Sequence, residues 1–198
     1  MSEIVVPTNG MTITENRTLA EGVYHLPDGI KIAGDTITVT GNKTTIVSDA
    51  QTGTGIQING NSVTVRDVSI NGFYHGIRAD HASDITVENV TVRGTQEIDG
   101  IETFLYLWLP IEKAYGGGIL LHDCKDSKII GCDVQHQMNG ILLYDCQTIL
   151  AEKNNGSFNS GWGIYLSNTN DSTIQDNQFD FCNRVYKRKS GEVRVEAD

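Results

Sequence analysis

Three side chains that can transfer protons stand at the same position of a repeated pattern. Asp80, His122 and Tyr144 each follow the glycine of a Gly-Ile pair by four residues. If equivalent positions of neighbouring repeats lie over one another, Asp80 would orient His122, and His122 or Tyr144 would exchange protons with a substrate hydroxyl or an acidic C–H group. We therefore predict that these three residues are catalytic.

Further polar and aromatic residues lie close to these positions or in residues 101–116, an aromatic segment that breaks the repeat. An arginine two residues after its glycine suits bidentate pairing with a carboxylate, and rigid aromatic rings suit stacking. The residues that we predict to bind substrate are His75, Arg78, Tyr106, Trp108, Trp162 and Tyr165. The alternative is a solvated or structural face, and Leu120 and Leu142, which share a column with Arg78, favour a face covered by the aromatic segment.

The sequence predicts no metal site and no cofactor. The five histidines show no HxH or HExxH spacing, and the cysteines form no CxxC pair. Asp and Asn are numerous at the expected turns, which leaves a calcium ion between coils as an open alternative. We expect the four cysteines to be free buried thiols, with a Cys124–Cys146 disulfide as the alternative.

The repeat itself predicts the fold. Five Gly-Ile pairs that open an alternating strand begin at Gly55, Gly76, Gly118, Gly140 and Gly163, at intervals of 21, 42, 22 and 23 residues. Alternating apolar and polar residues follow each pair, which indicates short strands with one buried face. The fold class is all-β: a single-stranded right-handed parallel β-helix with coils of about 22 residues. The doubled interval holds either a missed coil or one coil plus an insertion.

We expect one β-helix domain over residues 1–198. Residues 1–50 would form N-terminal strands that cover the first edge, and residues 51–183 regular coils with the aromatic insertion near 101–116. Residues 184–198 would form a last strand or a truncated edge, and self-association through an uncapped C-terminal edge is an open possibility. Three asparagines at similar offsets are predicted to form a turn ladder: Asn89, Asn154 and Asn177.

Charge and hydropathy restrict the partners. The formal net charge is −10, which argues against nucleic acid as a partner. No apolar run reaches the length of a membrane span. The first residues lack the pattern of a secretory signal, so we expect a cytoplasmic protein unless a leader was removed.

The repeats GIRADHASDITVENVTVRG and GILLHDCKDSKIIGCDVQ resemble those of the pectate-lyase-like parallel β-helix superfamily, especially its NosD-type carbohydrate-binding and sugar-hydrolysis domains. The resemblance covers residues 30–183 and implies a polysaccharide or oligosaccharide partner. It also implies a polysaccharide lyase, glycoside hydrolase or epimerase. The alternative is a non-catalytic sugar-binding or structural module, including a fragment of a longer chain. The motifs of polygalacturonases and mannuronan epimerases are absent apart from His75-Gly76-Ile77-Arg78.

Overall fold

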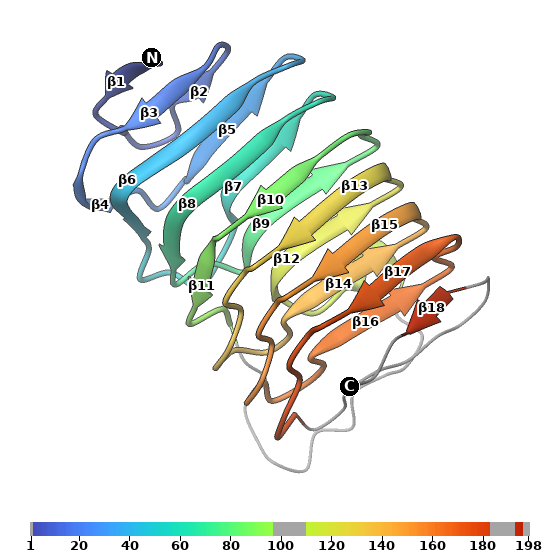
Figure 1. Cartoon of the computed structure of the whole chain (residues 1–198). Coiled ribbons are helices and arrows are strands. Elements are labelled where there is room, and N and C mark those ends of the chain that lie inside the picture. Colours follow the sequence, from blue (N-terminus) through green and yellow to red (C-terminus); the bar gives the residue numbers. More distant parts are fainter. Residues whose placement is uncertain (1, 97–109, 183–192, 196–198) are drawn as a thin grey trace.

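The computed structural model describes residues 2–96, 110–182 and 193–195, and it is an all-β solenoid of about seven turns. Figure 1 shows the strands stacked coil on coil along one axis. In these residues the strands form two parallel sheets. The predicted parallel β-helix with coils of about 22 residues is confirmed.

The larger sheet has eleven strands in the described residues: β1 (Glu3–Val5), β3 (Arg17–Leu19), β4 (Gly22–His25), β6 (Thr38–Val47), β8 (Thr64–Asn71), β10 (Thr86–Glu88), β11 (Thr91–Arg93), β13 (Lys125–Ile130), β15 (Gln147–Glu152), β17 (Ser172–Gln175) and β18 (Val193–Val195). The smaller sheet has seven: β2 (Thr12–Ile13), β5 (Ile30–Ala33), β7 (Thr54–Asn59), β9 (His75–Asp80), β12 (Gly117–His122), β14 (Ile141–Tyr144) and β16 (Ile164–Ser167). We call them the eleven-stranded and seven-stranded sheets.

The five Gly-Ile pairs of the repeat, together with Gly29-Ile30 before them, build one side of the core. Each isoleucine pairs in register with the isoleucine of the next coil, and all are almost completely buried: Ile30, Ile56, Ile77, Ile119, Ile141 and Ile164. The alternating pattern leaves the residues between them on the outer face of the seven-stranded sheet. Stacked aliphatic side chains therefore fix which polar residues become neighbours on that face.

The doubled interval contains an insertion, because β9 pairs directly with β12 and Asp80 lies opposite His122. Of the predicted aromatic insertion, residues 101–109 lie outside the described part of the chain. The described end, residues 110–116, includes the 3-10 helix η1 (Ile111–Lys113). Because β9 and β12 are direct neighbours, no further strand lies between them in the seven-stranded sheet.

Left-handed residues mark the corners, and they recur at equivalent positions of successive coils. The four columns are His81, Asp123, Asp145 and Asn168; Ser62, Asp84, Asp126, Thr148 and Asp171; Asp67, Asn89, Gly131, Lys153 and Asp176; and Gly72, Gly94, His136, Phe158 and Phe181. Asp, Asn and Gly tolerate this conformation best, which explains why these types crowd the turns.

The predicted asparagine ladder is right for two of its three members. Asn154 donates to the Asn177 side chain at 2.9 Å and to a backbone carbonyl of the preceding coil. Asn89 lies one position earlier, at an exposed left-handed corner, where it donates to Asp67 instead. The prediction for Asn89 was wrong, because Asn89 lies one residue earlier in its coil than Asn154 and Asn177 do in theirs. The inward positions equivalent to Asn154 are Val90 and Cys132 in the two preceding coils.

The four cysteines are free thiols, and the expectation that they are buried is confirmed for three of them. Cys124, Cys132 and Cys146 are buried in the core and Cys182 is partly exposed. No helix in the described residues is long and apolar enough to cross a membrane.

The close approach of coils at the corners predicts a contrast between two glycines. Both Gly72 and Gly131 have left-handed φ angles. A Cβ added at Gly72 would lie 1.7 Å from the carbonyl oxygen of Ser48, whereas a Cβ added at Gly131 would have no other atom within 4 Å. Because Asn tolerates the conformation, only the overlap differs. We expect Gly72→Asn to lower the free energy of unfolding by about 3 kcal/mol or more, and Gly131→Asn by less than about 0.5 kcal/mol, in urea denaturation. Equal losses would contradict this packing.

Candidate functional site

A hydrogen-bonded carboxylate and imidazole lie on the outer face of the seven-stranded sheet. Asp80 ends β9 and His122 ends β12 on the adjacent coil, and His122 Nδ1 lies 3.1 Å from Asp80 Oδ1. The side chains are 24% and 16% exposed respectively, so both are shielded from bulk water but reachable. The structure thus brings together two of the three residues predicted to be catalytic.

Arg78 fixes the carboxylate from the other side. Its Nε and Nη2 donate to the two oxygens of Asp80 at 2.7 and 2.8 Å, and Gln57 Nε2 donates at 3.4 Å. Burial opposes ionisation of Asp80, but the hydrogen bonds from Arg78, His122 and Gln57 outweigh it and lower the pKa of Asp80. Asp80 is therefore ionised at neutral pH, and the guanidinium fork predicted to bind a substrate carboxylate is already occupied by Asp80.

An ionised Asp80 determines the tautomer of His122. The carboxylate can only accept a hydrogen bond, so Nδ1 carries the proton and Nε2 of the neutral ring has the free lone pair. Asp145 Oδ2 lies 4.0 Å from this Nε2. The geometry is that of a positioned general base: one nitrogen is held by a carboxylate and the other is available to take up a proton.

A second histidine–aspartate pair lies beside the first. His81 Nδ1 is 2.8 Å from Asp123 Oδ2, and the His81 and His122 ring centroids are 5.0 Å apart. The hydrogen bond to Asp123 raises the pKa of His81, which is exposed. His81, Asp123 and Asp145 were not among the residues predicted from the sequence, although they occupy one corner column directly after the predicted positions.

Tyr144 lies in register with His122, but its side chain belongs to an apolar cluster. Its ring centroid is 5.3 Å from that of Tyr165, and it is 7% exposed. Burial, with smaller contributions from neighbouring tyrosines, raises the pKa of Tyr144 far above its ordinary value. The phenol of Tyr144 therefore stays protonated near neutral pH and is unable to act as a base. The catalytic role of Tyr144 stays a prediction.

The apolar cluster covers the C-terminal half of this face. Its buried members are Ala114, Leu120, Leu142, Tyr144, Trp162 and Tyr165, with Ile111 packed against them. The prediction that Leu120 and Leu142 lie beneath the aromatic segment is therefore confirmed for its described end. Trp162 and Tyr165 are each 5% exposed, so their rings pack within the cluster and present little surface to a ligand. Tyr106 and Trp108 lie outside the described residues.

His75 is also buried rather than open to substrate. It is 4% exposed, packs edge-on against Tyr74, and its Nδ1 has no hydrogen-bond partner in the described structure. Desolvation, followed by the positive charge of Arg78, lowers the pKa of His75 to about 4. The ring is therefore neutral at physiological pH, and its predicted role in substrate binding stays a prediction.

Fold and site together define a parallel β-helix protein with a polar cluster on one outer sheet. The chain belongs to the NosD family: the family model described as periplasmic copper-binding protein (NosD) matches residues 5–193. No protein of curated function matches the chain.

Several solved β-helix structures are similar to the chain. A provisionally assigned glycosyl hydrolase from Parabacteroides merdae is 12% identical, with a TM-score of 0.53 over 92% of this chain and 83% of that one. The mannuronan C-5 epimerase A-module from Azotobacter vinelandii is 13% identical, with a TM-score of 0.41 over 92% and 67%. A tailspike domain of bacteriophage CBA120 is 13% identical, with a TM-score of 0.42 over 94% and 43%. At these identities the likeness shows the fold alone.

The described residues do not present a copper centre of the kind that the family description suggests. They contain no group of three or more His, Cys, Asp or Glu side chains arranged to hold a metal ion. The soft donors Cys124, Cys132 and Cys146 lie in the core, and His81 and His122 are each held by an aspartate. The expectations for metal and calcium stay predictions.

The buried His75 predicts a pH dependence of stability. The unfolded chain protonates this residue near pH 6.5, whereas the folded protein keeps it neutral down to about pH 4. The unfolded state binds more protons in this window, so stability rises with pH there. From pH 7 to pH 5 we expect His75 to account for a loss of roughly 2 kcal/mol in the free energy of unfolding.

The His75→Gln variant should lose this component, whatever its absolute stability, while the exposed His25→Gln control keeps it. The measurement is urea denaturation at both pH values. An unchanged pH dependence in His75→Gln would show that His75 is not the group responsible.

Proposed function

We propose that this protein binds a polysaccharide or oligosaccharide on the outer face of the seven-stranded sheet and uses the Asp80–His122 pair for acid–base chemistry. The observation that supports this most is the hydrogen bond between His122 Nδ1 and Asp80, together with the two hydrogen bonds by which Arg78 holds the Asp80 carboxylate in place. The β-helix fold shared with a provisionally assigned glycosyl hydrolase is consistent with the proposal.

In the proposed reaction, His122 Nε2 takes a proton from a sugar hydroxyl or, where the unit is a uronate whose carboxyl group delocalises the electron pair left on C5, from its C5–H. Asp80 stabilises the imidazolium that forms, because its negative charge lies against Nδ1–H. The reaction class is that of a lyase, hydrolase or epimerase. The net charge of −10 favours neutral chains, and with them proton transfer from a hydroxyl, over polyuronates, which the protein's field would repel.

A second candidate is a non-catalytic sugar-binding or structural β-helix module. Two observations favour it: Arg78 is already engaged with Asp80, and the Trp162 and Tyr165 rings are buried in the apolar cluster. In this case the Asp80–His122 hydrogen bond joins coils and transfers no proton.

Replacing His122 separates the two candidates. On a panel of neutral and acidic polysaccharides, assayed by the ultraviolet absorbance of unsaturated products and by reducing ends, we expect His122→Ala to lower any measured activity by about 10²–10⁴-fold. The control is His25→Ala, because His25 is exposed, pairs with Asp49 and lies on the other sheet. Full activity in His122→Ala would refute the catalytic assignment, and a panel without any turnover would favour the binding module.

A further inference from the structure

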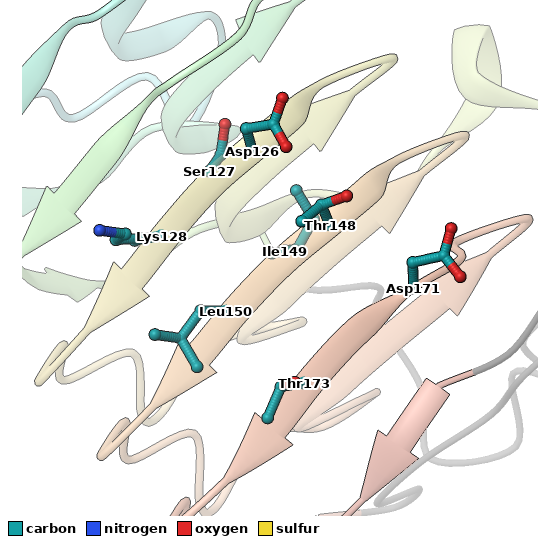
Figure 2. A pocket seen from close by; sticks show the side chains of 8 residues that line it. All are labelled: Asp126, Ser127, Lys128, Thr148, Ile149, Leu150, Asp171 and Thr173. Atoms are coloured by element: carbon teal, nitrogen blue, oxygen red, sulfur yellow. The ribbon is translucent and has the colours of Figure 1, made fainter.

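A second surface with binding character lies on the outer face of the eleven-stranded sheet. It is a shallow groove of about 290 Å³ over β13, β15 and β17, lined by Asp126, Ser127, Lys128, Thr148, Ile149, Leu150, Asp171 and Thr173 (Figure 2). Asp80 and His122 belong to the seven-stranded sheet, so the groove is separate from the acid–base pair.

Two parallel rows of side chains form the groove, as Figure 2 shows. One row consists of the left-handed corner residues Asp126, Thr148 and Asp171. The other consists of Lys128, Leu150 and Thr173, which are register partners on successive strands. The same arrangement of an outer polar row and an inner mixed row therefore repeats over three coils, at about 4.8 Å per coil.

The polar groups of the groove can form further hydrogen bonds with a ligand. In the described part of the chain, the carboxylate of Asp126 and the ammonium of Lys128 make no hydrogen bond or ion pair within the protein. Asp171 accepts one hydrogen bond, from Gln147 Nε2 at 3.0 Å. Carboxylate and hydroxyl oxygens at one wall and an aliphatic side chain, Leu150, between the rows suit a molecule with hydroxyl edges and a C–H face.

We propose that this groove is a second carbohydrate site, which holds a neutral oligosaccharide along the solenoid axis without acting on it. A hexopyranose unit is about as long as the coil repeat, so consecutive units would meet Asp126, Thr148 and Asp171 in turn. The hydroxyls donate to the carboxylates, and the C–H faces pack on Leu150. Two carboxylates against one ammonium disfavour an anionic chain.

Binding of cellohexaose, maltohexaose and mannohexaose, measured by calorimetry and saturation-transfer NMR, tests the proposal. The variant is Asp126→Asn/Asp171→Asn, because Asn keeps the left-handed conformation and removes only the charges. We expect it to weaken the binding of at least one hexasaccharide by about tenfold or more, since hydrogen bonds to charged groups are the strong ones.

The matched control is Asp84→Asn, which changes the same corner column one coil earlier, outside the groove. Asp84→Asn should leave this binding unchanged, and Asp126→Asn/Asp171→Asn should weaken the binding that remains in a His122→Ala background by about the same factor, so the result does not depend on the acid–base pair. An equal loss in Asp84→Asn, no loss on adding Asp126→Asn/Asp171→Asn to His122→Ala, or no binding of any of the three hexasaccharides would overturn the proposal.

Discussion

The structure depends on the in-register pairing of parallel strands between successive coils. Each coil satisfies its backbone hydrogen bonds with the coils above and below, so a residue's neighbours are those one repeat away in sequence. The stacked isoleucines fix this register, because a slip of one residue would turn the apolar row outward. The candidate site is a direct consequence, since Asp80 and His122 meet only because Ile77 lies over Ile119.

The corners separate the outer faces of the solenoid. Each coil turns at left-handed residues, and these positions favour Asp, Asn and Gly, so carboxylates and amides form columns at the sheet borders. One column contributes a wall of the groove beside β13, β15 and β17, and another places Asp145 near His122. In a third column, His136, Phe158 and Phe181 stack with ring centroids 5.1 Å apart, which offsets part of the cost of their conformation.

Much of the fold was predictable because the spacing of the Gly-Ile pairs equals the length of one coil. The same spacing predicted that Asp80 and His122 are neighbours if the doubled interval holds an insertion, and the pairing of β9 with β12 shows that it does. The spacing could not show that Arg78 turns back onto Asp80, because the direction of a long side chain depends on its local partners. Nor could it show that Tyr144 turns into the apolar cluster, since that depends on Ala114 and the inserted segment, which lie outside the repeat. Asn89 shows the remaining weakness: a shift of one residue moves a side chain from an inward position to an exposed corner.

The most direct test of the account is a cross-link across the insertion. Thr86 and Lys128 are register partners on adjacent coils, and Leu150 lies one coil further. In a Cys182→Ser background, Thr86→Cys/Lys128→Cys should form a disulfide on oxidation, because neighbouring parallel strands lie about 4.8 Å apart. Thr86→Cys/Leu150→Cys, about 10 Å apart by the same spacing, should not. Peptide mass spectrometry that finds the second cross-link, or fails to find the first, would contradict the stacking on which both sites depend.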